Sequence, residues 1–245
     1  MSSSITASEP GAVKIDPNWR ENCLASMDRR HYYPMSPSCQ IQDLADHYEI
    51  IFGCKNDGVF VELGGYDGQD TSNTAGLADI GWRGIYVEPV PEYAERCRHR
   101  HPGHNIKIMQ YCVGRTEGTV DFSVTGGEFG SSAHPMLREQ YSANQIEAVD
   151  IKVHQKTVDQ ILSEADIAPG FDLLIIDIEG NELEALMGFD LRKYQPKVMI
   201  VELFDHWAGH NLGPLHAETR RYIIGQGYRP YLIEEHNTIF VPNFD

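Results

Sequence analysis

Acidic residues follow apolar runs at several places in this chain, and such positions lie at the ligand-binding edge of a parallel sheet. The first run leads into a glycine-rich turn over residues 60–70, with the sequence FVELGGYDGQD. A second run, over residues 85–89, has the sequence IYVEP and places Glu88 at its end. The turn lacks the lysine with which a P-loop binds phosphates. It therefore suits a ligand that carries a ribose and positive charge rather than a row of phosphates.

The glycines of this turn do not fit dinucleotide binding. Gly64, Gly65 and Gly68 do not follow the G-x-G-x-x-G spacing. A pyrophosphate also needs bare backbone amides at a helix N-terminus, whereas Asp67 and Asp70 place anions there. The negative charge at the turn therefore disfavours an NAD cofactor.

S-adenosylmethionine suits the same turn better, because carboxylates attract its sulfonium and its α-ammonium. Glu88 is placed to accept hydrogen bonds from both ribose hydroxyls, and the amides near Ser72 and Asn73 suit the methionine carboxylate. The adenine is expected near the end of the third strand. The residues that we expect to bind the cofactor are Glu62, Gly64, Gly65, Asp67, Ser72, Asn73, Glu88, Tyr111 and Cys112.

A second acidic group suggests where the reaction takes place. Asp177 and Glu179 end a strongly apolar run, and we interpret them as the pair that binds or deprotonates a substrate hydroxyl. His206 is a further candidate base, because imidazole titrates near neutrality. Glu202 ends the next apolar run, and His134 lies in a glycine- and serine-rich segment; both are candidate substrate contacts.

Each of these assignments competes with a purely structural one. Acidic and small polar residues favour helix N-termini, so capping would also explain Ser72, Asn73 and the Asp177–Glu179 pair. A lone histidine is more often structural than catalytic. Asp177, Glu179, Glu202 and a histidine also offer ligands to a hard divalent metal. Their spacing in the sequence is not diagnostic of a metal, and we assign no metal site.

Strands and helices alternate along the chain and position these residues. The patterns predict strands over residues 59–63, 84–88, 106–113, 118–124, 149–153, 173–178, 198–203, 228–233 and 238–241. They predict helices over residues 42–52, 70–80, 91–100, 158–163 and 216–225, and one that opens at 179–182 and ends at Gly188. Residues 126–145 are interpreted as a long loop. The alternation predicts a doubly wound, mostly parallel α/β sheet with an antiparallel hairpin at its edge.

Composition narrows the class of protein. The 245 residues carry a formal net charge of −16, which argues against a nucleic-acid partner. The five cysteines are scattered without a C-x-x-C pair, which favours reduced thiols over disulfides or zinc. We find no apolar stretch long enough to span a membrane and no apolar signal segment behind the initial MSSS. We expect a soluble cytoplasmic protein without a membrane partner, and its oligomeric state stays open.

Three segments, 58–68, 72–74 and 81–89, resemble the FkbM family of S-adenosylmethionine-dependent methyltransferases, in the branch whose turn ends in Asp-Gly. The sequence DLLIIDIEGNE at residues 172–182 is similar to the second family motif, D-x-E-G-x-E. The resemblance covers about residues 38–241. Two departures concern Ile175, where the family often has lysine, and Gly65-Tyr66, where Ala-Asn is common.

The resemblance implies a Rossmann-like class I methyltransferase fold with an antiparallel strand in the sheet. It also implies O-methylation of a hydroxyl, for which a sugar or another small natural product is the expected acceptor. The alternatives are a non-catalytic binding or accessory protein and, as a third class, an NAD-dependent oxidoreductase. We divide the chain into a partly ordered N-terminal arm, residues 1–38, and a methyltransferase domain, residues 39–245.

Overall fold

The computed structural model describes residues 32–36, 38–126, 130–207 and 209–243. Most of the predicted arm, residues 1–31, lies outside the described residues. The described part of that segment packs into the core, where Tyr32 and Tyr33 are 0% and 2% exposed. The ring of Tyr33 contacts those of Tyr48 and Trp82 edge-on. No helix in the described part of the chain is long and apolar enough to cross a membrane.

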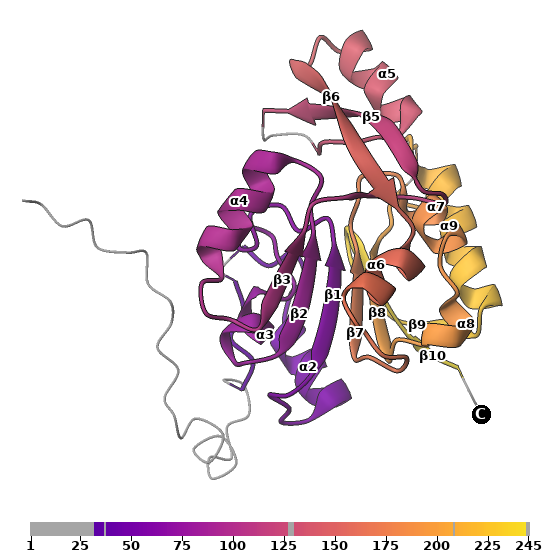
Figure 1. The fold of residues 1–245 in the computed structure, drawn as a ribbon. Helices are drawn as coiled ribbons and strands as arrows, with labels where there is room; N and C mark the ends of the chain where they lie inside the picture. Colours follow the sequence, from indigo (N-terminus) through magenta and orange to yellow (C-terminus); the bar gives the residue numbers. More distant parts are fainter. Residues whose placement is uncertain (1–31, 37, 127–129, 208, 244–245) are drawn as a thin grey trace, which may run out of the picture.

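A seven-stranded sheet forms the centre of the molecule, in the order β3-β2-β1-β7-β8-β10-β9 (Figure 1). Its strands are β1 (Val59–Leu63), β2 (Arg83–Val87), β3 (Ile106–Met109), β7 (Leu173–Ile176), β8 (Val198–Glu202), β9 (Tyr228–Ile233) and β10 (Asn237–Pro242). β10 runs antiparallel to both of its neighbours, and the other pairs are parallel. The predicted fold class, a mostly parallel sheet with an antiparallel hairpin at its end, is confirmed.

Helices cover both faces of this sheet. Each strand contributes side chains to both of the resulting cores, since its side chains alternate between faces. Val61 and Leu63 of β1 pack in one core with α6 (Val158–Glu164), α7 (Glu182–Met187) and α9 (Gly213–Gly225). Phe60 faces the opposite core, which contains residues of α2 (Leu44–Phe52), α3 (Ala75–Asp79) and α4 (Pro91–Arg100). The remaining helices are α5 (Pro135–Ala143) and α8 (Leu191–Tyr194).

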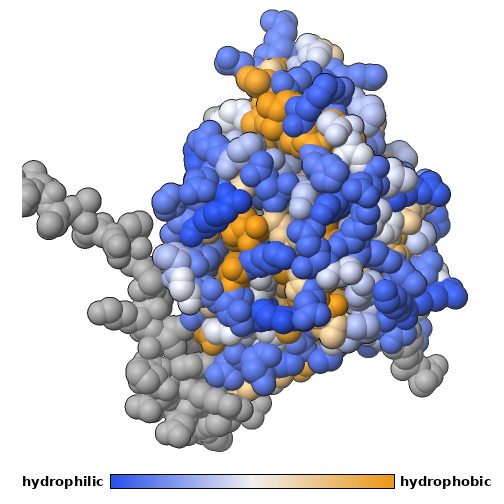
Figure 2. Space-filling view, in the orientation of Figure 1, coloured by the Kyte–Doolittle hydropathy of each residue, from blue (hydrophilic) through white to orange (hydrophobic). Residues whose placement is uncertain are grey.

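A second sheet lies beyond the carboxyl ends of the parallel strands, at the top of Figure 1. It consists of β4 (Cys112–Val113), β5 (Gly118–Thr125) and β6 (Ala148–Lys156), with β6 in the middle. Cys112, Phe122 and Val153 form its small apolar core together with Val90. Figure 2 shows hydrophobic surface gathered over this part of the molecule. The second sheet thus places an apolar layer opposite the edge where ligands are expected.

The structure corrects three of the predicted elements. The helix predicted over residues 70–80 is only α3, because Thr71 adopts a left-handed φ of 57° and the chain forms a turn up to Thr74. The strand predicted over residues 106–113 divides into β3 and β4, which belong to different sheets. The loop predicted over residues 126–145 contains α5, which starts at a proline in the first helical position. The short helix α8 was not predicted.

Candidate functional site

The glycine turn after β1 holds three strand ends together. The amides of Gly64 and Gly65 both donate to the carbonyl of Val87 at the end of β2, at 3.0 and 3.1 Å. Gly64 has a φ of 91°, and a Cβ at this position would collide with the backbone carbonyl of Asp177. Only glycine allows this approach. The turn and the end of β7 are therefore in direct backbone contact.

A cavity of about 300 Å³ opens at this edge of the sheet, within the range of small-molecule sites. It brings together six of the predicted site residues: Gly64, Glu88, Tyr111, Cys112, Asp177 and Glu179. Residues that were not predicted also line it, among them Tyr66, Thr71, Tyr93 and Phe122. Phe122 was identifiable as the inward-facing residue of an alternating strand, but the sequence did not show that this strand covers the site.

Glu88 is fixed at the cavity wall by two backbone amides. Its Oε1 accepts from the amide of Val90 at 2.8 Å, and its Oε2 accepts from the amide of Tyr66 at 3.0 Å. The residue is 6% exposed, and burial raises the pKa of its carboxyl to about 7. A carboxylate has about four acceptor positions, so both oxygens retain capacity for a ligand. The carboxylate is thus oriented before any ligand binds.

Glu62 lies beneath the turn and does not line the cavity. Its Oε2 accepts from the hydroxyl of Ser72 at 3.3 Å and from that of Thr74. Thr74 Oγ1 in turn lies 2.9 Å from the hydroxyl oxygen of Tyr86. The side chain is 4% exposed, and burial raises the pKa of Glu62 to about 8. Its contacts support the turn from within the core.

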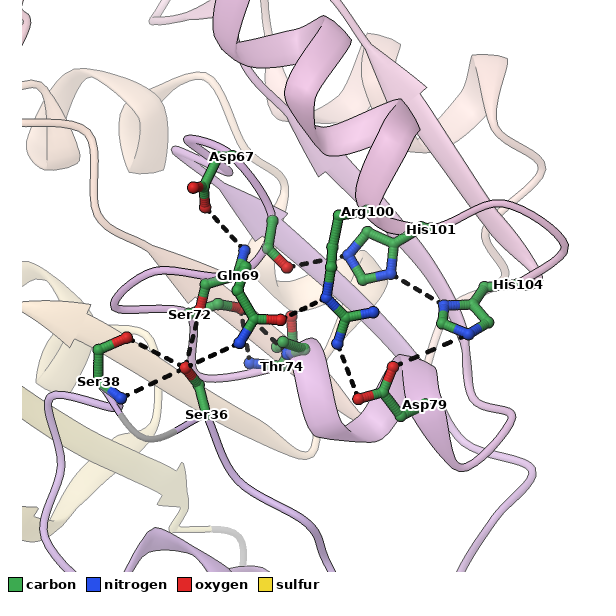
Figure 3. A network of polar contacts seen from close by, with 12 residues as sticks. Ser36, Ser38, Asp67, Gln69, Ser72, Thr74, Asp79, Arg100, His101 and His104 are labelled. Carbon is green, nitrogen blue, oxygen red and sulfur yellow. Dashed lines mark hydrogen bonds and ion pairs between the residues drawn. The ribbon is translucent and has the colours of Figure 1, made fainter. Parts of the chain in front are cut away.

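Asp67 also serves the turn itself (Figure 3). Its Oδ1 accepts from the amides of Gln69 and Asp70 at 2.9 and 2.8 Å. On the other side of the turn, His101 Nε2 lies 3.0 Å from the carbonyl oxygen of Gly68. Burial lowers the pKa of His101 to about 4, so the ring is neutral and its Nε2 donates to that carbonyl. The glycine turn is therefore held from both sides by polar contacts.

Three more of the expected cofactor contacts lie outside the cavity wall. Gly65 packs against the side chain of Tyr86, because a Cβ there would come within 2.9 Å of that residue. Ser72 is 4% exposed, and its Oγ accepts from the amide of Ala75 at 3.0 Å. Asn73 is 2% exposed, and its carbonyl accepts from the hydroxyl of Tyr48 at 2.9 Å. Their part in cofactor binding stays a prediction.

Three carboxylates meet where β7 and β8 end. Asp177, Glu179 and Glu202 each have an oxygen within 4.8 Å of the others, and Asp177 and Glu179 line the cavity. Burial, together with the neighbouring carboxylates, raises the pKa of each of the three. Glu202 is 6% exposed and does not line the cavity. Glu202 is far from the other two in the sequence, and the parallel pairing of β7 and β8 brings it close to them.

The turn that carries Asp177 and Glu179 is held by two fully buried residues that the sequence analysis did not single out. Glu182 Oε1 accepts from the amides of Ile178 and Gly180, at 3.2 and 3.0 Å. His216 Nδ1 accepts from the amide of Phe204 at 2.8 Å, and its Nε2 lies 3.4 Å from Glu182 Oε2. His216 therefore connects the turn after β7 with the segment after β8.

The two histidines predicted for the site lie outside the cavity wall. His206 Nδ1 is 3.9 Å from an oxygen of Asp205. His134 precedes α5 and packs beside Gly180, and burial lowers its pKa. Their predicted roles as base and substrate contact stay predictions.

Comparisons with known proteins were made against families and solved structures. The family model described as the methyltransferase FkbM domain matches residues 62–230. An O-methyltransferase from Bacillus cereus in complex with SAH is 13% identical, with 94% of this chain and 92% of that chain covered and a TM-score of 0.45. Fibrillarin from Aeropyrum pernix with bound S-adenosyl-L-methionine is 12% identical, with 77% and 66% covered and a TM-score of 0.42. No curated protein gave a significant match.

Proposed function

The chain belongs to the FkbM family of S-adenosylmethionine-dependent methyltransferases, and we propose that it transfers the methyl group to a hydroxyl of a small molecule. The observation that carries this proposal is the shared cavity. Glu88, Asp177 and Glu179 all line it. One cavity thus offers a fixed acceptor for a ribose and an acidic pair for a hydroxyl.

In the proposed arrangement the cofactor lies along the turn after β1. Glu88 accepts hydrogen bonds from the two ribose hydroxyls, since both of its oxygens are already oriented by backbone amides. The adenine lies toward Tyr111 and Cys112, and the methionine end lies toward Thr71. The positive sulfonium then approaches the carboxylates of Asp177 and Glu179, which attract it.

The reaction is an in-line displacement that the protein promotes mainly by alignment. The acceptor oxygen forms a bond to the methyl carbon as the bond from that carbon to sulfur breaks. The sulfonium becomes a neutral thioether, and the products are S-adenosylhomocysteine and a methyl ether. The hydroxyl proton passes to a carboxylate, for which we propose Asp177 with Glu179 beside it. Their raised pKa values make them stronger bases than ordinary carboxylates.

Calorimetric titration with S-adenosylmethionine, followed by mass-spectrometric screening of hydroxylated compounds, tests this function. We expect saturable binding of the cofactor and a product heavier by one methylene unit. A protein that binds the cofactor but methylates none of a broad set of sugars, phenols and hydroxy acids would contradict the proposed acceptor class. Failure to bind the cofactor at millimolar concentration would instead favour the non-catalytic alternative.

A further inference from the structure

The buried carboxylates around the cavity differ in how their oxygens are satisfied. Glu62 accepts from two hydroxyls, and Glu88 accepts from two backbone amides. Glu182 accepts from two amides with one oxygen; the other makes no hydrogen bond but lies 3.4 Å from His216 Nε2. Glu202 is as buried as these residues, at 6% exposure, yet its Oε2 has no hydrogen-bond partner among the described residues. A buried carboxylate oxygen without a donor is costly, so a cation bound at this oxygen would stabilise it.

The surroundings of Glu202 indicate what that ligand is. Its nearest acidic neighbours are Asp177 and Glu179, whose oxygens lie within 4.8 Å of its own. In the described part of the chain, none of the three forms an ion pair with a lysine or arginine. Arg220 of α9 is bound to Asp205 through two hydrogen bonds, and Lys197, which precedes β8, pairs with Asp172. Three adjoining carboxylates therefore lack a cation from the protein.

We propose that Asp177, Glu179 and Glu202 bind one divalent cation of the Mg²⁺ or Mn²⁺ type. Hard cations of this kind prefer carboxylate oxygens. In an octahedral shell with metal–oxygen distances of about 2.1 Å, ligand oxygens lie at most about 4.2 Å apart. The carboxylate oxygens of the three residues lie within 4.8 Å of one another, so small side-chain rotations would bring them to this spacing. The cation would also offset the repulsion between the three acids.

The position of this site suggests how it would act in the reaction. Three protein oxygens leave about three of six positions for water or for the acceptor, and Asp177 and Glu179 open onto the cavity. A hydroxyl that coordinates the cation becomes more acidic and is held in place for attack. An acceptor with two adjacent oxygens, such as a vicinal diol or a hydroxy acid, could occupy two of these positions. This role rests on the proposed function, whereas binding of the cation does not.

Titration of the full-length, cofactor-free protein with Mn²⁺, followed by the electron paramagnetic resonance signal of the free ion, tests the site. We expect one site per chain that Mg²⁺ competes for. Glu202→Gln keeps the shape of the side chain but removes its negative charge, and it should weaken Mn²⁺ binding by at least about 10-fold, the lower end of the loss seen for residues that only support a metal ligand. Glu184→Gln is the matched control on α7, because Glu184 is an exposed acid near the same strand ends. It should leave the affinity unchanged.

Absence of Mn²⁺ binding at millimolar concentration, or equal weakening by both variants, would overturn the proposal. Circular dichroism checks that the variants are folded, and Asp177→Asn provides a second ligand change if Glu202→Gln is not. Calorimetry with S-adenosylmethionine in the presence of a chelator separates this inference from the proposed function. If the protein binds Mn²⁺ but methylates no hydroxyl, the proposed cation site is supported and the proposed activity is refuted. Full methyl transfer in the presence of chelator would support the proposed activity and would refute the role of the cation in it.

Discussion

At the scale of single residues, Glu88 and Glu62 show how one residue type can serve two purposes around the same turn. Both are almost fully buried, and burial raises the pKa of both. Glu88 lines the cavity, whereas Glu62 is enclosed by the hydroxyls of Ser72 and Thr74. The first is therefore expected to affect ligand affinity, and the second is expected to affect stability.

Replacement of Glu88 by glutamine should weaken binding of S-adenosylmethionine by about 1–3 kcal/mol, because a charged acceptor of ribose hydroxyls is lost. In the unchanged protein the affinity should fall as the pH drops below the pKa of about 7, since the carboxyl becomes protonated. The variant should lack this dependence. Calorimetry between pH 5.5 and pH 8.5 measures both effects, with the exposed Glu92→Gln as control. An unchanged affinity would remove Glu88 from the ribose site.

Asp177→Asn should retain the cofactor and lose turnover by about 10²–10⁴-fold, the usual contribution of a general base. The amide fills the same space but cannot accept the hydroxyl proton. Single-turnover rates and calorimetry on the same preparation separate the two effects. Asp166→Asn changes an exposed aspartate far from the cavity and should have no effect. Full activity in Asp177→Asn would exclude this residue from the reaction.

Glu62 should make the protein less stable as the pH rises. Its carboxyl has an ordinary pKa of 4.5 when exposed and one of about 8 in the fold. Between these values only the folded state holds the proton, so the free energy of unfolding falls by about 1.4 kcal/mol per pH unit on its account. Glu62→Gln should remove this slope, whereas the exposed Glu147→Gln should not. Urea unfolding at several pH values measures it, and identical slopes would refute the assignment.

At the scale of the elements, the contact between the turn after β1 and the end of β7 fixes the geometry of the site. Gly64 is the point of contact, because its Cα faces the carbonyl of Asp177. β1 pairs with β7 in register, with Leu63 opposite Ile176. The cofactor turn and the acidic pair are thus positioned by the same two strands, and one cannot shift without the other.

Gly64→Ala should lower both stability and cofactor affinity. An alanine at a φ of 91° is strained by about 1–2 kcal/mol, and its Cβ would in addition collide with the carbonyl of Asp177. Gly103→Ala isolates the strain, because Gly103 has a φ of 80° and open space around its Cα. The difference between the two variants in urea unfolding gives the cost of the collision. Equal stability losses would show that the turn is free to move away from β7.

The sequence allowed most elements of the large sheet to be predicted, because buried parallel strands are continuous apolar runs. The predictions were wrong where tertiary contacts override local pattern. The helix predicted from Asp70 starts later because Glu62 binds the hydroxyls of Ser72 and Thr74. Residues 106–113 are mostly apolar, and their pattern does not show that the chain leaves one sheet for the other after Met109.

At the scale of the whole molecule, the cavity lies between two sheets. The large sheet contributes the ends of its parallel strands, and the small sheet contributes Phe122 and the segment around Ser131. The candidate residues at strand ends were predictable, since the carboxyl edge of such a sheet is the usual place for ligands. Cys112 of β4 was also among the predicted residues, but the contribution of β5 was not predictable, because no spacing in the sequence relates β5 to β1.

Because the cofactor is expected to contact several elements, it should stabilise the whole domain. At a concentration of about 100 times its Kd, S-adenosylmethionine should add about 2.7 kcal/mol to the free energy of unfolding. For a chain of this size the melting temperature should rise by roughly 5–10 °C. Differential scanning calorimetry measures the shift, and NAD serves as the control ligand. A comparable rise of the melting temperature with NAD would contradict the argument that the acidic turn disfavours dinucleotides.

One further consequence concerns protein engineering. The carbonyl of Glu179 accepts from the hydroxyl of Ser132 at 2.7 Å, and a Cβ at Gly130 would collide with the carboxylate of Glu179. Segment 130–133 therefore forms a wall of the cavity, joined to the acidic turn through Ser132 and to β5 through the backbone pair of Ser132 and Ser123. Libraries designed to widen the range of proposed acceptors should vary Ser131 and Ala133 but keep Gly130 and Ser132, so that the contacts to Glu179 are preserved.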